Sequence, residues 1–384
     1  MDWRPHAAAM AARLTPAGSL WRVPLETVPR HLFVPAWWER ANGGWTRRHG
    51  PDDPDRWLEG AYRDTSLVTR VGPSHADLAL PGEQPAGAPT SSSTNPSLLI
   101  QMYRHAELAP GLDVLDVGTG SGYGTALLAT LLDPLHVDSI DIDGYLVKAA
   151  GDRLAHLALN PFVAVHDATG PLPASALPGD YDRIIATVAV RPVPPAWIDA
   201  LRPGGRIVTV IDGTRAILTA DKQPDGTLAG RIERDWAGFM SARHGDDYPP
   251  GADSAQIDHM LTVPGECSRE GKYPLANLDD AWELYSNLAV AEPGVQTYWR
   301  RGDGDTPDAL LLWDQVGSWA RAEGVRGLIP TVHSAGPVDL WRILEGLKTR
   351  WLTEGSLPLY GASVRVEADG VIHLARGAWG ATID

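Results

Sequence analysis

Val-Leu-Asp-Val-Gly-Thr-Gly-Ser-Gly-Tyr-Gly, residues 114–124, is the most informative stretch of this 384-residue chain. An apolar run that contains one acid is followed at once by alternating glycines, and an apolar segment of helical composition begins at residue 126. This order predicts a β-strand, a tight glycine turn and an α-helix. Gly118, Gly120 and Gly122 permit positive φ, so a ligand can approach the main chain and the helix N-terminus closely.

The spacing of the glycines separates this turn from dinucleotide-binding loops. Gly118 and Gly120 fit the pattern G-x-G-x-x-G, but Tyr123 occupies the third glycine position. Asp116 lies two residues before the first glycine, an arrangement typical of S-adenosylmethionine (SAM) sites, where a cationic methionine moiety needs an acid nearby. We therefore expect a SAM site here, and a tight turn without a ligand is the alternative.

Acids also stand at the ends of the next two expected strands. Asp141 ends the strand 137–142, where a carboxylate can accept both ribose hydroxyl protons of an adenosyl ligand. A helix N-cap is the alternative for Asp141, and Asp143 competes for the ribose role. Asp167 is expected either to accept from the adenine amino group or to cap a turn. The expected cofactor-binding residues are Asp116, Gly118, Thr119, Gly120, Gly122, Tyr123, Asp141, Ile142, Asp167 and Ala168.

Strands and helices alternate from Asp113 to Ile211, which predicts an α/β fold with a doubly wound, Rossmann-like parallel sheet. The pattern changes after about Ile211. We expect a SAM-binding catalytic domain over residues 1–213 and a smaller C-terminal α+β domain over residues 214–384. Other expected elements are a loop over 42–55, helices over 278–288, 310–322 and 337–352, and a terminal hairpin of 364–367 with 371–374.

Composition narrows the classes of partner. The net charge of −15 argues against nucleic acid and anionic membrane surfaces. The single cysteine, Cys267, leaves no disulfide framework and no cysteine cluster for a metal, and we expect no metal. The N-terminus does not resemble a signal peptide, and no apolar run is long enough to span a bilayer, so a cytoplasmic location is expected. Nothing in the composition predicts a particular oligomeric state.

Taken together, these motifs resemble the protein-L-isoaspartate O-methyltransferase family over about residues 28–211. The resemblance rests on Val-Pro-Arg-His-Leu-Phe-Val-Pro at 28–35 together with Gly-Thr-Gly-Ser-Gly-Tyr at 118–123. Supporting matches lie at residues 61–64, 181–185 and 201–205. The resemblance implies a SAM-dependent carboxyl O-methyltransferase. Contact with an acidic substrate and packing of the N-terminal helix both remain open for Arg30 and His31.

Two features depart from the family pattern. The family's loop before the first long helix reads Thr-Ile-Ser-x-Pro, with the serine at the methyl-transfer site, whereas residues 92–96 here read Ser-Ser-Thr-Asn-Pro. Thr94 therefore stands in the place of that serine, and the resemblance implies that Thr94 and Ser93 hold the acceptor carboxylate; a polar loop without substrate contact is the alternative. The other departure is the C-terminal unit, which the family's compact repair enzymes generally lack, together with an enlarged segment between Trp38 and Trp57.

With these two departures, the chain resembles the branch of the family that is found with ribosomally made modified peptides such as lanthipeptides, lasso peptides and graspetides. By that resemblance, we expect methylation of an aspartate carboxylate in a cyclised precursor peptide, which the C-terminal domain recognises. The ester would close to an aspartimide that can open to isoaspartate. The alternatives are a general protein-L-isoaspartate repair methyltransferase and an inactive SAM-binding protein that recognises a partner.

Overall fold

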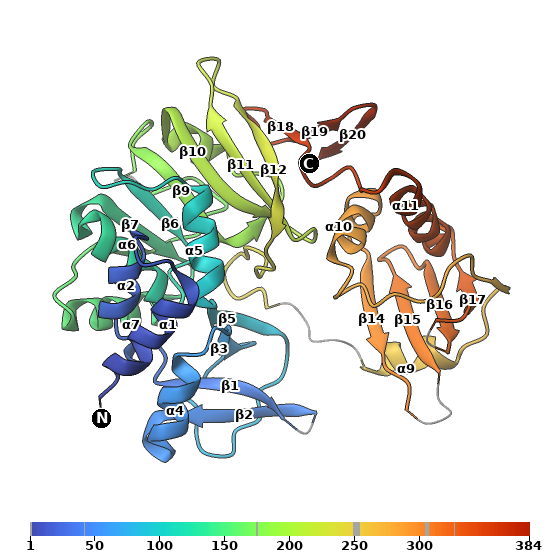
Figure 1. Ribbon diagram of the computed structural model, residues 1–384, viewed down its shortest axis with the longest axis horizontal. Coiled ribbons are helices and arrows are strands. Elements are labelled where there is room, and N and C mark those ends of the chain that lie inside the picture. The colour runs from blue at the N-terminus through green and yellow to red at the C-terminus, as the bar shows by residue number, and fades with distance from the viewer. Residues whose placement is uncertain (1, 42, 174–175, 249–253, 304–306, 326) are drawn as a thin grey trace.

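A ten-stranded sheet with the order β20-β19-β18-β12-β11-β10-β9-β6-β7-β8 forms the centre of the computed structural model (Figure 1). The structure describes residues 2–41, 43–173, 176–248, 254–303, 307–325 and 327–384. The parallel part of the sheet consists of β6 (Val114–Val117), β7 (Val137–Asp141), β8 (Phe162–Val165), β9 (Tyr181–Val190) and β10 (Leu201–Ile211). Its accompanying helices are α5 (Pro96–His105), α6 (Tyr123–Leu132), α7 (Gly144–His156) and α8 (Pro195–Ala200), with a short 3-10 turn η2 (Pro134–His136). The expected doubly wound fold is confirmed.

The sheet continues beyond its parallel part in antiparallel strands. These are β11 (Ala216–Lys222), β12 (Leu228–Trp236), β18 (Ser363–Val366), β19 (Ile372–Arg376) and β20 (Trp379–Ile383). The expected terminal hairpin is present as β18 and β19, but it pairs with β12 and so belongs to the central sheet. The expected boundary after residue 213 falls in the turn between β10 and β11, inside this one continuous sheet. Hydrogen bonding across β10–β11 and β12–β18 is the physical reason that the sheet cannot be divided there.

A separate core forms between residues 254 and 357. Its elements are α9 (Ser254–Thr262), β13 (Cys267–Glu270), α10 (Trp282–Ala291), β14 (Gln296–Arg300), β15 (Asp308–Trp313), β16 (Trp319–Gly324), β17 (Thr331–Ala335) and α11 (Leu340–Glu354). Its five strands follow the order β13-β17-β16-β15-β14. We call residues 254–357 the second unit; it is the orange group on the right of Figure 1. Leu288, Leu312 and Leu340 lie in the core that this unit forms for itself. We propose that the second domain is this unit and not residues 214–384.

The helix expected over residues 310–322 is wrong, because this segment is the β15–β16 hairpin. The apolar run of Leu310, Leu311 and Leu312 is buried on both faces of the strand, and a run of that kind carries no period that separates strand from helix. The turn is set by Asp314, whose carboxylate accepts from the N–H groups of Val316 and Ser318.

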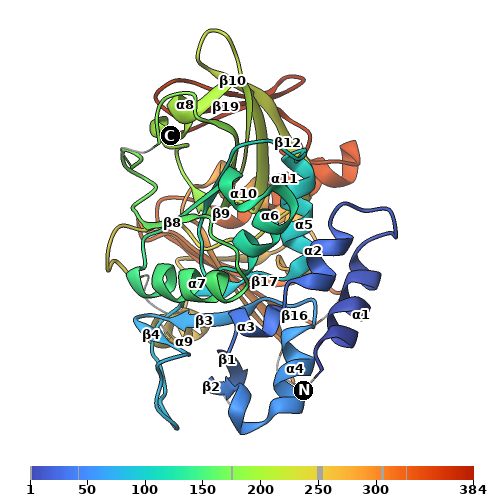
Figure 2. The same cartoon turned by 90° about the vertical axis from the view of Figure 1, so that its left-hand side faces the viewer.

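A small sheet precedes the central one along the chain. The N-terminal elements are α1 (Arg4–Leu14), α2 (Arg22–Thr27), α3 (Arg30–Phe33), β1 (Ala36–Ala41), β2 (Gly44–His49), η1 (Gly50–Asp52), α4 (Pro54–Ala61), β3 (Leu67–Val71), β4 (Ser74–His75) and β5 (Pro89–Ser93). The order is β2-β1-β3-β4, with β5 paired to β3. Both views place this sheet below the central one (Figure 1 and Figure 2). The loop expected over 42–55 is wrong in part, since β2 pairs with β1 and buries Trp45 beside Trp38.

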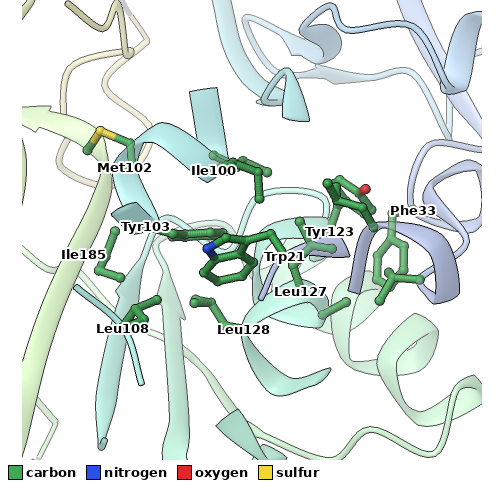
Figure 3. Packing of buried hydrophobic residues seen from close by; sticks show 14 of the residues in the cluster. Trp21, Phe33, Ile100, Met102, Tyr103, Leu108, Tyr123, Leu127, Leu128 and Ile185 are labelled. Atoms are coloured by element: carbon green, nitrogen blue, oxygen red, sulfur yellow. The ribbon is translucent and has the colours of Figure 1, made fainter. Parts of the chain in front are cut away.

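The glycine turn rests on a large buried cluster beneath α6. Trp21 stacks on Tyr103 with ring centroids 4.7 Å apart, and Tyr123 and Phe33 lie at the far side of the same cluster (Figure 3). Each such side chain stabilises the fold by about 1.5–3 kcal/mol on burial. The cluster therefore holds α6, and with it the turn at its N-terminus, against α2 and α5.

Candidate functional site

A cavity of about 150 Å³ lies at the carboxyl ends of the parallel strands. Most of its wall comes from the glycine turn after β6, the ends of β7 and β8, the strand β5 with its following residue, and residues 238–243, and α5 and β9 also contribute. The sites expected on both the glycine turn and the polar loop thus meet in one cavity. The lining includes Ser93, Thr94, Asp116, Gly118, Thr119, Gly120, Tyr123, Asp141, Ile142, Asp167 and Ala168.

The glycine turn has positive φ at Gly118 (+99°), Gly120 (+52°) and Gly122 (+89°). A Cβ added at Gly118 would lie 2.9 Å from Thr187 Oγ1, so the turn is pressed closely against β9. Gly122 does not line the cavity; a Cβ there would lie 2.8 Å from the Cβ of Ala150 on α7. The structure therefore gives Gly122 a packing role between α6 and α7, in contrast to the cofactor contact expected from sequence.

Two acids lie at the turn, of which Asp116 is buried and Asp141 is partly exposed. Asp141 Oδ2 accepts from the N–H of Gly120 at 2.8 Å, and burial raises the pKa of Asp141 above its usual range. Asp116 accepts from Thr125 Oγ1 at 2.7 Å and from Ser139 Oγ at 2.9 Å. Burial raises the pKa of Asp116 to about 6, since it outweighs these two hydrogen bonds. Both carboxylates are thus held in place by the protein before any ligand binds.

The competing acid Asp143 is occupied elsewhere. It caps α7 by accepting from the N–H groups of Tyr145 and Leu146, and it forms a buried ion pair with Arg70. It is absent from the residues that line the cavity. Of the two acids after β7, Asp141 is therefore the one available to a ligand.

The end of β8 is tied to a later loop. Asp167 accepts from Thr169 Oγ1 at 2.6 Å and pairs with His244 Nδ1 at 2.9 Å. Burial by itself raises the pKa of Asp167, but these hydrogen bonds outweigh it and hold the pKa below its usual range. The carbonyl of Ala168 accepts from Trp197 Nε1 at 2.7 Å. These hydrogen bonds hold Asp167 and Ala168 in position at the cavity wall.

Thr119 and Tyr123 turn their side chains toward the protein interior. Thr119 Oγ1 lies 2.7 Å from Ser139 Oγ beneath the turn. The Tyr123 ring is buried in the cluster of Figure 3, 5.5 Å from the guanidinium carbon of Arg30. Within the described residues, Tyr123 Oη has no hydrogen-bond partner. Although both residues line the cavity, their side chains serve the packing of the turn.

Arg30 holds Thr94 and the end of β5, a segment expected to be a polar loop that instead pairs with β3 as a strand up to Ser93. Its side chain is fully buried and donates to the carbonyls of Ser93 and Thr94, each at 3.2 Å. It also donates to three carbonyls at the end of α4 and just after it, those of Ala61, Arg63 and Thr65. The question left open by sequence is therefore answered for Arg30, because it binds backbone and has no path to a substrate.

His31 has a similar packing role. Its Nδ1 lies 2.9 Å from Tyr62 Oη, and its ring lies among Trp3, Trp57 and Tyr62. Burial lowers the pKa of His31 to about 4, so the ring is neutral at pH 7.

The hydroxyl of Ser93 is buried in the wall of the cavity and has no hydrogen-bond partner within the described residues.

Residues 238–243 form a wall that sequence reasoning missed. The N–H of Ala189 donates to the carbonyl of Met240, and the N–H of Ala242 donates to the carbonyl of Ala189, both at 2.8 Å. This bridge places Phe239 and Arg243 in the cavity lining. No local motif marks the segment, since only its pairing with the end of β9 brings it to the site.

The lining suits an adenosyl ligand with a positive sulfur. Three carboxylates, those of Asp116, Asp141 and Asp167, line the cavity and can attract a cation, and the backbone of Gly118 and Gly120 forms part of its wall. The described residues contain no group of three or more His, Cys, Asp or Glu side chains that could hold a metal. Fold and cavity together define the class of protein, a SAM-dependent methyltransferase.

Comparison with known proteins gives the family. The family model described as protein-L-isoaspartate(D-aspartate) O-methyltransferase matches residues 79–237. A protein-L-isoaspartate O-methyltransferase of Ignicoccus hospitalis is 37% identical over 210 residues, which cover 53% of this chain and 81% of the relative. One of Hyperthermus butylicus is 36% identical over 216 residues, covering 53% and 73%. The chain belongs to the protein-L-isoaspartate O-methyltransferase family.

A solved structure bears on the second unit. A protein titled protein-L-isoaspartate O-methyltransferase aligns with 97% of this chain and 99% of its own, with a TM-score of 0.52 and 17% sequence identity. At that identity the likeness shows the fold alone. It nevertheless extends beyond the part that the family model matches, so the second unit does not by itself set this chain apart from proteins of that name.

Among the residues that the structure describes, no helix has the length and apolar character needed to cross a membrane.

Proposed function

We propose that this protein transfers a methyl group from SAM to the carboxylate of an isoaspartyl residue in peptides or proteins. The observation that carries the proposal is the position of Thr94, which lines the same cavity as the glycine turn and Asp141. Membership of the family supports the choice of acceptor. Of the alternatives that the sequence left open, general isoaspartate methylation therefore has the better support.

The chemistry asks for alignment more than for a base. A carboxylate is already ionised at pH 7 and is the nucleophile. When bound, SAM supplies an electrophilic methyl group on a positive sulfur. The carboxylate oxygen must lie in line with that methyl group and the sulfur, and holding this geometry lowers the barrier. The protein's task is to bind and orient the two partners.

Individual residues have distinct roles in this proposal. The hydroxyls of Thr94 and Ser93 donate to the acceptor carboxylate, and the hydrogen bonds of Arg30 to their carbonyls keep both hydroxyls in position. Asp141 accepts from the ribose hydroxyls, while Asp116 places negative charge below the sulfonium. These assignments extend to Gly118 and Gly120, whose backbone lies against the ligand.

The second candidate acceptor is an aspartate in a cyclised precursor peptide, favoured by Thr94 in the place of the family's serine. In that case the ester is the first product. The backbone amide nitrogen that follows the aspartate attacks the ester carbonyl, methanol leaves with the amide proton, and an aspartimide ring forms. Addition of water across the imide then gives aspartate or isoaspartate.

Three peptides of the same composition separate these proposals. One carries isoaspartate in a linear chain, one carries aspartate in the same chain, and one carries aspartate in a ring closed by a side-chain crosslink. Incubation with SAM followed by intact-mass analysis should give a methyl ester on the isoaspartyl peptide only. Modification of the cyclised peptide alone would refute isoaspartate as the acceptor and support the second candidate acceptor. If calorimetry shows that SAM binds but none of the three peptides is modified, both candidate acceptors are refuted and an inactive SAM-binding protein is favoured.

A further inference from the structure

A second pocket, of about 210 Å³, lies where the second unit meets the central sheet. Arg215 enters it from the turn between β10 and β11, Tyr285 from α10, and Thr297 and Trp299 from β14. The complete lining is Arg215, Asn277, Leu278, Asp279, Tyr285, Gln296, Thr297, Trp299 and Leu310. This pocket has no part in the methyl-transfer chemistry described above.

The pocket is rich in hydrogen-bond donors without partners. Within the described part of the chain, the side chains of Tyr285, Gln296, Thr297 and Trp299 form no hydrogen bond. Arg215 donates through Nη2 to Asp279 Oδ1 at 2.7 Å and stacks on the Tyr285 ring at 4.5 Å, which leaves its other N–H groups available. Because an arginine presents a fork of donors, the N–H groups that Asp279 leaves free can donate to a further carboxylate or carbonyl oxygen.

One wall of the pocket is an exposed sheet edge. β14 is the last strand in the order β13-β17-β16-β15-β14, and in the described structure it pairs with β15 on one side only. Edge strands offer a row of unpaired backbone groups to which an extended peptide can add as a further strand. Gln296, Thr297 and Trp299 lie on this strand and in the pocket together.

Backbone hydrogen bonds connect the segment of Arg215 with the wall of the cofactor cavity. The N–H of Ala237 donates to the carbonyl of Arg215 at 3.0 Å, and the next residue, Gly238, lines the cavity. Ser241, also in the cavity lining, donates to Asp212 Oδ1 at 2.5 Å, three residues before Arg215. Figure 1 shows α10 and β14 on the side of the second unit that faces the central sheet. Arg215 is therefore joined by one backbone hydrogen bond to the residue that precedes the cavity wall.

We propose that the edge of β14 and the pocket around Arg215 bind an extended, acidic segment of the substrate polypeptide that flanks the methylated residue. This inference rests on the proposed function, because that function identifies the bound polypeptide as the substrate of methyl transfer. Backbone hydrogen bonds to β14 supply affinity without regard to sequence, and Arg215 selects an acidic side chain. The second unit is thereby a docking site for the substrate.

Two isoaspartyl peptides test the docking site. The short one contains only the residues next to the isoaspartate, and the long one continues into an acidic flank that can reach β14. Arg215→Gln should raise KM for the long peptide about tenfold, the effect of one lost charged hydrogen bond, and leave KM for the short peptide and the affinity for S-adenosylhomocysteine unchanged. Tyr285→Phe, which keeps the stacking surface, should give a smaller rise for the long peptide only.

Arg365→Gln is the matched control, because Arg365 is a half-exposed arginine of β18 outside both pockets. Equal kcat/KM for the two peptides in the unmodified protein, or an Arg215→Gln effect equal for both, would overturn the docking site. Fluorescence anisotropy of the labelled long peptide without SAM separates the two proposals. Binding that Arg215→Gln abolishes, combined with no methylation of any peptide, would leave the docking site standing and refute the proposed function.

Discussion

Arg30 shows how one buried side chain can hold distant backbone segments together. Its guanidinium donates to five carbonyls from two segments that lie about 30 and 60 positions away in the chain. Complete burial lowers the pKa of Arg30 to about 10, which still leaves it charged at pH 7. The charge is compensated by carbonyl dipoles, and this arrangement explains the need for arginine within Val-Pro-Arg-His-Leu-Phe-Val-Pro.

Replacement of Thr94 tests the role of its hydroxyl. Thr94→Ala should lower kcat on an isoaspartyl peptide by roughly tenfold to a hundredfold, since a hydrogen bond to a charged acceptor contributes about 1.5–3 kcal/mol. Thr94→Ser retains the hydroxyl and should behave nearly as the unmodified protein. Calorimetry with S-adenosylhomocysteine is the control, and both variants should bind it normally. An alanine variant of full activity would show that Thr94 has no contact with the acceptor.

Asp116 predicts a particular dependence of stability on pH. Its folded pKa is raised from 3.8 to about 6, so the carboxyl's contribution to stability is fully present below pH 3.8 and is lost as the pH rises through about 6. The shift corresponds to about 3 kcal/mol between pH 4 and pH 7. Urea unfolding of the ligand-free proteins at pH 4 and pH 7 should show that the free energy of unfolding of Asp116→Asn does not fall in this way as the pH rises. Parallel pH curves for the two proteins would contradict it.

At the scale of the element, the glycine turn between β6 and α6 offers a matched pair of substitutions. Gly122→Ala should destabilise the protein by about 3 kcal/mol, because φ is +89° and the new Cβ would lie 2.8 Å from that of Ala150. Gly120→Ala should cost only about 1 kcal/mol, since its φ of +52° suits the left-handed region and the nearest atom, Ser92 O, is 3.4 Å away.

Thermal unfolding and binding of S-adenosylhomocysteine together read out this pair. Gly122→Ala should show the larger fall in Tm. Gly120→Ala, which places a methyl group in the cavity wall, should show the larger loss of affinity relative to its fall in Tm. Equal changes in Tm for the two variants would contradict the assignment of Gly122 to packing.

The elements that sequence patterns located well are those with a clear period or a turn signal. The strand, turn and helix around residues 114–132 and the hairpin of β18 and β19 are examples. The β15–β16 hairpin was mistaken for a helix because a doubly buried strand has no alternation. The wall formed by residues 238–243 could not be found at all, since its position depends on a bridge to β9.

At the scale of the whole molecule, the central sheet needs the last three strands of the chain, which continue it from β12. Removal of residues 356–384 deletes β18, β19 and β20 and exposes the edge of β12. The deleted core residues include Val364, Val366, Ile372, Leu374 and Ile383. At about 2 kcal/mol for each buried side chain, the loss is on the order of 10 kcal/mol, which is comparable with the whole stability of a domain.

A chain that ends at Gly355 should therefore aggregate or lose binding of S-adenosylhomocysteine, although every residue that lines the cofactor cavity is retained. Size-exclusion chromatography and calorimetry provide the readouts. Arg365→Gln in the full-length protein is the control for a change confined to the surface of β18. A monomeric truncated chain with normal affinity would contradict this expectation and show that β18, β19 and β20 are not needed to form the cofactor cavity.

The sequence by itself located the glycine turn, the acids Asp116, Asp141 and Asp167 at the strand ends, and Thr94, and it indicated the cofactor and the family. These signals are local, because backbone conformation and strand-end chemistry depend on neighbouring residues. Only the tertiary structure decided that Gly122 and Arg30 act through packing and backbone contacts, that residues 238–243 complete the cavity, and that the final strands belong to the central sheet. These depend on contacts between distant segments, and no local pattern records them.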